Sequence, residues 1–131
     1  MRLLLDTHIW VWSVAEKSRL RPRVLKALEN PANELWISPI SVWEFLMLVE
    51  KKRLVPNVDA KEWIRKALGA GPFQEASLTT EVVLATRDIR LPRRDPADAF
   101  LAATAKVFGL TLVTADARLI GAKGISVLPN R

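Results

Sequence analysis

Short apolar runs alternate with longer segments of helical periodicity along the chain, and this alternation limits the fold more than any other feature. Each apolar run stops after a few residues at a polar or turn-forming residue, which is typical of buried strands. The runs predict strands over residues 2–5, 35–38, 73–78, 111–114 and 125–128. The segments between them predict helices over residues 9–16, 22–30, 41–52, 59–68, 81–88, 97–108 and 117–121. Strands separated by helices form βαβ units, so we expect an α/β fold with three layers, α/β/α, around a mostly parallel sheet of four to five strands.

The composition narrows the class of protein further. Half of the 131 residues are hydrophobic and 26% are charged, a balance that excludes intrinsic disorder and favours a single domain over residues 1–131. The absence of cysteine excludes disulfides, thiolate metal sites and thiol catalysis. The net charge of +6 suits a polyanionic partner such as nucleic acid. Because no apolar run has the length of a signal peptide or a bilayer span, we expect a cytoplasmic protein that does not contact a membrane.

Four acidic residues fall at comparable places in this pattern. Asp6 and Asp116 come just after predicted strands, and Glu44 and Asp98 lie in the first turn of predicted helices. Right-handed crossovers place the carboxyl ends of parallel strands at one edge of a sheet. Helices that follow those strands begin at the same edge, which is where open α/β sheets bind ligands. We therefore expect the four carboxylates to converge.

Each acid also has a purely structural explanation. Ser41-x-x-Glu44 has the spacing of a capping box. Asp98 lies in the first turn of a helix for which Asp95 is a suitable N-cap, so its charge favours the helix dipole. The two acids that follow strands, of which Asp6 is the first, are also plausible N-caps. Helix capping is therefore the alternative to a shared chemical site.

Four converging carboxylates repel one another unless a cation lies among them. With no cysteine and one histidine, the chain offers mainly oxygen ligands, which select Mg²⁺ or Mn²⁺ over zinc. A few carboxylates around a hydrated Mg²⁺ ion are typical of nuclease and phosphoryl-transfer sites. Thr7 and Thr114 stand next to this cluster in the sequence. Their hydroxyls either support the metal and its waters or make ordinary hydrogen bonds at the strand ends.

Four motifs occur in series over nearly the whole chain: Leu4-Leu5-Asp6-Thr7-His8, Ser38-Pro-Ile-Ser-Val-Trp-Glu44, Asp95-Pro-Ala-Asp98-Ala-Phe-Leu-Ala-Ala-Thr-Ala105 and Leu112-Val-Thr114-Ala-Asp116. With these motifs the chain resembles the PIN-domain family, and within it the VapC-like toxins of bacterial toxin–antitoxin pairs. The resemblance implies a small α/β/α fold, Mg²⁺- or Mn²⁺-dependent cleavage of RNA, dimerisation, and inhibition by a cognate antitoxin.

The resemblance also assigns roles to individual residues. Asp6, Glu44 and Asp98 match the three core acids of the family's site, and Asp116 matches a fourth that is less uniform across the family. Asp95 precedes the third motif and is assigned to capping. The sequence departs from the family where related toxins often carry an arginine immediately after the third acid, because alanine follows Asp98 here.

A basic segment leads to the third motif and contains Arg87, Arg90, Arg93 and Arg94. Arginine clusters suit phosphate recognition, and these residues precede the helix that carries Asp98. They are candidates for RNA contacts, and a solvated basic loop is the alternative.

Two functions follow from these observations. The first is a Mg²⁺- or Mn²⁺-dependent endoribonuclease that cleaves single-stranded or looped RNA and acts as the toxin of a toxin–antitoxin pair, with its antitoxin and a second copy of itself as partners. The second is a non-catalytic α/β binding module whose acids only cap helices. Metal binding separates the two, because a set of helix caps requires no divalent ion.

Overall fold

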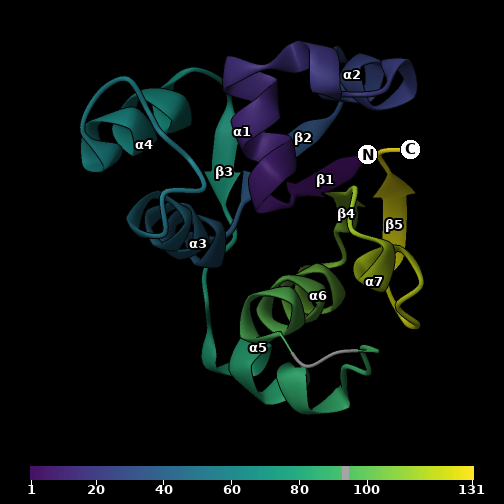
Figure 1. Ribbon diagram of the computed structural model, residues 1–131. Coiled ribbons are helices and arrows are strands. Elements are labelled where there is room, and N and C mark those ends of the chain that lie inside the picture. The colour runs from purple at the N-terminus through teal and green to yellow at the C-terminus, as the bar shows by residue number, and fades with distance from the viewer. Residues whose placement is uncertain (93–94) are drawn as a thin grey trace.

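The chain forms a five-stranded sheet in which all strands are parallel, as the computed structural model shows for residues 1–92 and 95–131 (Figure 1). The strand order is β3-β2-β1-β4-β5. The strands are β1 (Arg2–Leu5), β2 (Glu34–Ile37), β3 (Phe73–Glu75), β4 (Thr111–Thr114) and β5 (Ser126–Pro129). The expected α/β fold with a sheet of four to five strands is confirmed, and the order places β1 at the centre of the sheet.

Seven α-helices connect and cover the strands in the described part of the chain, residues 1–92 and 95–131. They are α1 (Thr7–Ala15), α2 (Pro22–Glu29), α3 (Pro39–Glu50), α4 (Ala60–Gly69), α5 (Thr80–Ala85), α6 (Pro96–Phe108) and α7 (Ala117–Ile120), and 3₁₀ turns lie at Lys17–Arg19 and Thr86–Asp88. Gly109 ends α6 in the left-handed conformation, with φ of 64°, so the chain turns directly into β4. Among the described residues, no helix has both the length and the apolar character that a membrane span requires.

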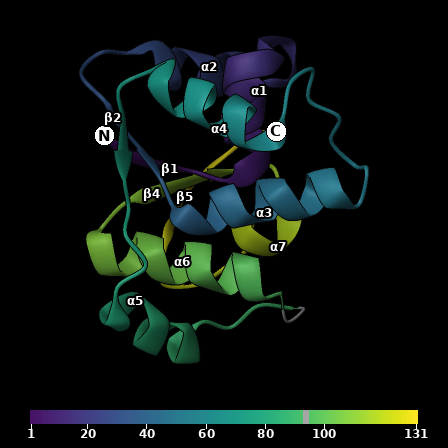
Figure 2. The ribbon, with the colours of Figure 1, turned by 90° about the vertical axis from the view of Figure 1, so that its left-hand side faces the viewer.

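Alternation along β1 divides the core into two halves, one on each face of the sheet. Leu3 and Leu5 belong to one hydrophobic cluster, and Leu4 belongs to the other. The first cluster includes side chains of α1, α2, α3 and α4, and the second is built mainly on α6. Figure 2 shows α1, α2 and α4 on one side of the sheet and α5 and α6 on the other, which gives the expected three layers.

The start of α3 differs from the prediction in a way that matters for the site. The helix begins at Pro39 instead of Ser41, because Ser38 is the N-cap and its hydroxyl accepts a hydrogen bond from Ile40 N at 3.1 Å. The predicted Ser41-x-x-Glu44 capping box is therefore wrong. Glu44 lies in the second turn of α3, where it has no capping role.

The third strand is also shorter than expected, since it ends at Glu75 instead of continuing to residue 78. Residues 76–79 form a connection to α5, which begins one residue earlier than predicted, with Thr79 as its N-cap. The chain leaves the sheet here because β3 is an edge strand that pairs only with β2.

Candidate active site

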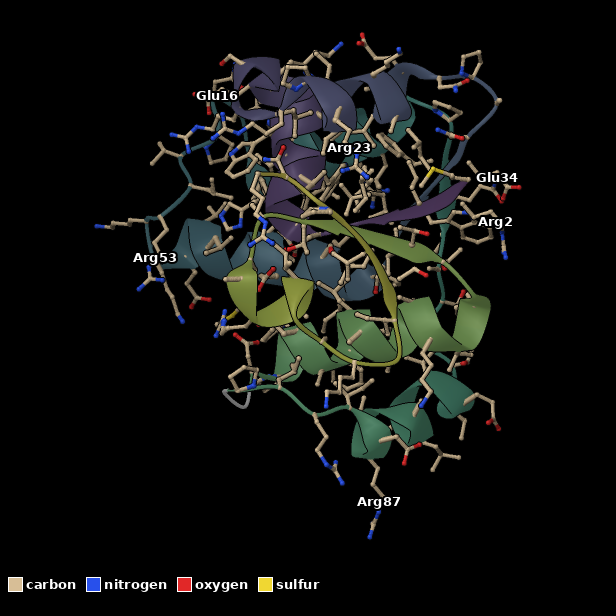
Figure 3. All side chains as sticks on the ribbon, turned by 90° about the vertical axis from the view of Figure 1, so that its right-hand side faces the viewer. Arg2, Glu16, Arg23, Glu34, Arg53 and Arg87 are labelled. Carbon is tan, nitrogen blue, oxygen red and sulfur yellow. The ribbon has the colours of Figure 1, made fainter. Side chains whose placement is uncertain are left out.

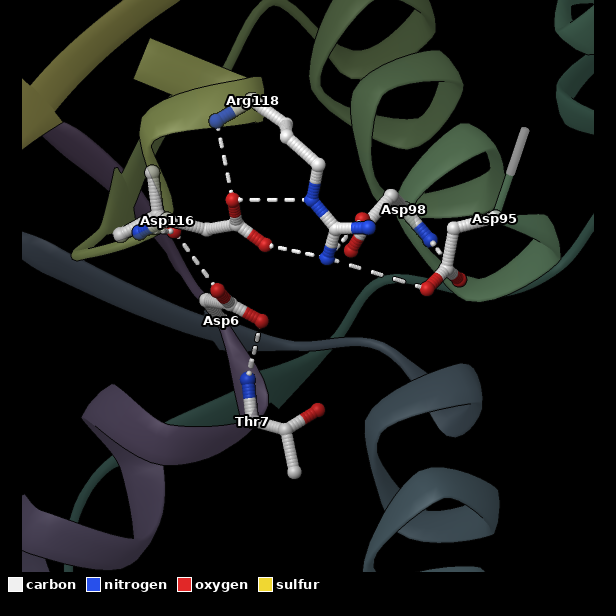
Figure 4. Close-up of polar contacts among 7 residues, drawn as sticks. Asp6, Thr7, Asp95, Asp98, Asp116 and Arg118 are labelled. Atoms are coloured by element: carbon white, nitrogen blue, oxygen red, sulfur yellow. Dashed lines mark hydrogen bonds and ion pairs between the residues drawn. The ribbon is translucent and has the colours of Figure 1, made fainter. Parts of the chain in front are cut away.

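The carboxyl ends of β1 and β4 meet at one edge of the sheet, because these strands are neighbours with Leu5 opposite Val113. Asp6 follows β1 directly and caps α1, since its Oδ1 accepts a hydrogen bond from Thr7 N at 2.7 Å. The Asp6 side chain is buried, with 8% of its surface exposed. Figure 4 shows it facing the first turns of α6 and α7.

Thr114 connects the acids that follow the two strands. Its buried hydroxyl donates to Asp6 Oδ2 at 2.6 Å and accepts from Asp116 N at 3.0 Å. Of the two roles predicted for Thr114, the structure contains the strand-end hydrogen bonds. Asp116 in turn caps α7, because its Oδ1 accepts from Arg118 N at 2.9 Å.

Asp98 enters the same region from the first turn of α6. Asp95 caps this helix as predicted, with its Oδ1 accepting from Asp98 N at 3.2 Å, and Pro96 is the first helical residue. The Asp98 carboxylate is 5% exposed, and its Oδ2 accepts no hydrogen bond from the described residues. Instead of a hydrogen bond, Asp98 Oδ2 makes an ion pair with Arg118 Nη2 at 3.1 Å.

Arg118 is the residue of this site that sequence analysis missed. Its Nη2 lies 2.7 Å from Asp116 Oδ2, 3.1 Å from Asp98 Oδ2 and 3.9 Å from Asp95 Oδ2 (Figure 4). The signal that points to it is the Asp116-x-Arg118 spacing at the start of a helix, which places both side chains at the same edge. The guanidinium supplies one positive charge among three carboxylates.

Glu44 approaches the cluster from the second turn of α3. Burial raises the pKa of its carboxyl, and the negative charges of Asp6 and Asp95 raise it further. The Thr7 hydroxyl is buried nearby, and its interaction with the Glu44 carboxyl offsets part of this rise in pKa. Thr7 therefore faces Glu44 at this edge.

Burial, together with repulsion among the acids, disfavours the charged forms of Asp6, Glu44 and Asp98. Burial raises the pKa of Asp6, and the hydrogen bond from Thr114 offsets part of this effect. Burial also raises the pKa of Asp98 to about 7, with Asp95, Asp116 and Asp6 adding to the rise despite the opposing charge of Arg118. Only Asp116 has a lowered pKa, because Arg118 donates hydrogen bonds to its carboxylate.

These residues fit a hydrated divalent cation. The donors are hard oxygens, and burial raises the pKa of the Asp6 and Asp98 carboxyls, so a nearby cation would favour their charged forms. Within residues 1–92 and 95–131, no group of three or more acidic or histidine side chains is placed so that it could hold a metal ion by itself. This arrangement suits Mg²⁺, which keeps several waters and binds proteins through one or two carboxylates.

Two of the four predicted arginine contacts, Arg87 and Arg90, lie near the N-terminus of α6. Arg87 and Arg90 line a cavity of about 790 Å³ together with Asp95, Pro96 and Phe100. Arg90 Nη1 donates to Arg87 O at 2.9 Å, and Figure 3 shows the Arg87 side chain extending outward from the fold. Arg93 and Arg94, the other two predicted contacts, lie outside the described residues.

Comparison with known proteins identifies relatives over almost the whole chain. The family model described as PIN domain matches residues 3–124. A protein of Mycobacterium tuberculosis named Ribonuclease VapC22 is 34% identical over 120 residues, which cover 89% of this chain and 88% of that protein.

Solved structures of low sequence identity share the fold. A VapBC2 structure from Rickettsia felis, bound to a promoter DNA fragment, matches with a TM-score of 0.73 at 18% identity over 98% of each chain. DNA-bound VapBC from Salmonella typhimurium matches with a TM-score of 0.69 at 15% identity over 100% of this chain and 99% of that one. A toxin–antitoxin complex from Klebsiella pneumoniae matches with a TM-score of 0.62 at 24% identity over 98% of each chain.

Proposed function

This chain belongs to the PIN domain family and is VapC-like, and from that premise we propose that it is a Mg²⁺- or Mn²⁺-dependent endoribonuclease that cleaves single-stranded or looped RNA. The observation that carries the proposal is the Asp98 carboxylate, which is only 5% exposed and has a pKa of about 7 beside two further acids. A helix cap needs neither property. The resemblance to a ribonuclease at 34% identity supports the same chemistry.

The proposal gives the four acids a common task. Asp6, Glu44, Asp98 and Asp116 hold the cation directly or through water, and one of them accepts the proton of the attacking water. Thr114 positions the acids that follow β1 and β4 through its two hydrogen bonds. The bound cation supplies Lewis-acid stabilisation of the charge that develops on the phosphate.

The bond changes follow from hydrolysis of a phosphodiester. The water oxygen forms a bond to phosphorus while the bond from phosphorus to the 3′-oxygen breaks. The leaving 3′-oxygen takes up a proton from water, so the products carry 5′-phosphate and 3′-hydroxyl ends. Arg87 and Arg90 are proposed to contact phosphates of the RNA, because they line the cavity that adjoins Asp95.

We further propose that the chain is the toxin of a toxin–antitoxin pair, that a cognate antitoxin inhibits it, and that it forms a homodimer. The support is its similarity to a VapC protein and its fold, which it shares with chains of VapBC and toxin–antitoxin complexes. The proposed activity requires access to cellular RNA, which agrees with the cytoplasmic location expected from the sequence.

The test is cleavage of a mixed single-stranded RNA pool by the purified protein with Mg²⁺, with EDTA and with an Asp6→Asn variant. We expect cleavage only with the metal and its loss in Asp6→Asn, because the amide removes a charged ligand but still caps α1. Asp59→Asn is the matched control, since Asp59 caps α4 in the same way outside the acidic cluster. It should cleave like wild type.

Two outcomes contradict the proposal. Equal cleavage by wild type and Asp6→Asn means that the activity is a contaminant. Absence of cleavage together with absence of Mn²⁺ binding by calorimetry favours the binding module, which draws support from the caps that Asp6 and Asp116 make.

A further inference from the structure

A second cavity, of about 280 Å³, lies on the α3 side of the candidate active site. Its lining includes Glu44 and Asp95 from the acidic cluster, and Trp43, Lys51 and Arg53 from α3 and the turn that follows it. It shares Asp95 and Pro96 with the cavity that Arg87 lines. The α3 cavity is called the Trp43 groove below.

Trp43 differs from the other four tryptophans of the chain. Trp10, Trp12, Trp36 and Trp63 each pack against another aromatic ring. Trp43 is 49% exposed and has no aromatic or cationic partner among the described residues. A large flat side chain therefore stands free next to Glu44, with a face that a planar ligand can cover.

Lys51 and Arg53 supply positive charge at the far end of the groove. Neither side chain forms an ion pair or a hydrogen bond within residues 1–92 and 95–131. Lys51 follows the last residue of α3, where its charge also favours the helix dipole. That effect leaves the ammonium group free to bind an anion. Figure 3 shows the Arg53 side chain extending from the loop beyond α3.

Helix geometry sets the length of the groove. Trp43, Met47 and Lys51 follow one another at intervals of four residues, which places them along one face of α3. At 1.5 Å per residue, Trp43 and Lys51 are separated by about 12 Å along the helix axis. The Trp43 ring thus lies beside Glu44, and the positive charge of Lys51 lies further along the same face of α3. Single-stranded nucleic acids bind surfaces that combine aromatic rings with cations.

We propose that the Trp43 groove is a nucleotide-binding subsite for single-stranded RNA, in which Trp43 stacks on a base and Lys51 and Arg53 contact phosphates next to the cleavage site. The inference rests on the proposed function, because it assigns the groove to the substrate of that reaction. RNA is favoured over a protein partner because the groove ends at the catalytic acids and its cations are unpaired.

The test measures binding of a labelled, mixed-sequence single-stranded RNA of about 12 nucleotides by fluorescence anisotropy. The full chain carries Asp98→Asn so that the probe stays intact in the presence of Mg²⁺. Trp43→Ala should weaken binding by roughly 5- to 100-fold, which is the range for loss of one base–aromatic stack. Trp43→Phe should restore most of the affinity, because phenylalanine keeps a stacking surface.

Lysine variants test the phosphate contacts independently. In Lys51→Gln, the slope of log affinity against log salt concentration should fall by about 0.7, the value for one phosphate contact on a single strand. Lys52→Gln is the matched control, because Lys52 carries the same charge one residue away and does not line the groove. Its salt slope should equal that of the parent protein. Thermal melting confirms that each variant is folded.

The outcomes separate this inference from the proposed function. Wild-type affinity in Trp43→Ala, or equal losses in Trp43→Ala and Trp43→Phe, overturns the subsite. A change in sedimentation without a change in RNA affinity also overturns it, because the groove is then an interface between copies of the chain. If the Trp43 and Lys51 effects hold but wild type cleaves no RNA, the subsite stands and the nuclease fails. If wild type cleaves RNA and the groove variants bind RNA with normal affinity, the nuclease stands and the subsite fails.

Discussion

At the scale of single residues, the guanidinium of Arg118 provides part of the positive charge that the acidic cluster needs. It holds the pKa of Asp116 low, yet that of Asp98 remains raised to about 7. The charge of Arg118 therefore does not offset the burial and the neighbouring acids that raise the pKa of Asp98. A divalent cation that binds beside it must compete with Arg118 for the same carboxylate oxygens.

Replacing Arg118 by glutamine should therefore affect the metal-free and metal-bound protein in opposite directions. Without metal, the melting temperature should fall by a few degrees, because two acids lose their counter-charge. With metal, Mn²⁺ affinity measured by calorimetry should increase, because a repelling charge is gone. Arg2→Gln is the matched control, since Arg2 pairs with Glu34 outside the cluster. Weaker Mn²⁺ binding in Arg118→Gln would instead mean that Arg118 positions the metal ligands.

At the scale of secondary-structure elements, the starts of α1, α6 and α7 converge at one edge of the sheet. Each of these helices begins with an aspartate cap: Asp6, Asp95 and Asp116. Capping and metal binding are therefore compatible for Asp6 and Asp116, because one oxygen accepts the backbone N–H while the other faces the cluster. From the sequence, helix capping and metal binding were alternative roles for Asp6 and Asp116. The geometry allows each residue to have both roles.

Variants of Asp95 test helix capping separately from catalysis at the start of α6. Asp95→Ala should destabilise the protein by about 0.5–2 kcal/mol, because the N-cap bond to Asp98 N is lost. Asp95→Asn keeps the cap and should cost much less. Chemical denaturation measures both effects. RNA cleavage by Asp95→Asn should remain within a few-fold of wild type, and its complete loss would show that Asp95 acts as a metal ligand.

At the scale of the whole molecule, the buried acids link stability to pH. Asp98 has an ordinary pKa of 3.8 when unfolded and about 7 in the folded protein, so the folded state binds its proton more tightly. The stability that this proton contributes is present at low pH and is lost as the pH rises from about 4 through 7. Asp6 and Glu44, whose pKa values are also raised, act in the same direction.

The metal-free protein should therefore melt at a higher temperature near pH 5 than near pH 8. The difference in the free energy of unfolding should be about 1–4 kcal/mol, from 1.4 kcal/mol for each unit of pKa shift. Scanning calorimetry in EDTA measures it, and Asp98→Asn should flatten the dependence because it removes the contribution of Asp98. A melting temperature that rises towards pH 8 would contradict the raised pKa of Asp98.

The sequence by itself determined the fold class and three of the four acid positions at the sheet edge. Strand and helix periodicities are local, and Asp6, Asp98 and Asp116 follow strand ends or helix starts that those periodicities locate. Right-handed crossovers then bring such residues to one edge regardless of side-chain detail. Glu44 was assigned to the correct helix, but its capping role was wrong because Ser38 and Pro39 start α3 earlier.

Only the tertiary structure placed Arg118 among the carboxylates and Trp43 beside them. Arg118 reaches Asp98 across 20 residues of sequence because β4 pairs with β1 and α7 begins next to α6. Periodicity places Trp43 on a helix, but its lack of a partner depends on what packs against α3. The contact of a long side chain with a distant segment depends on the relative position of several elements, and no local pattern in the sequence encodes it.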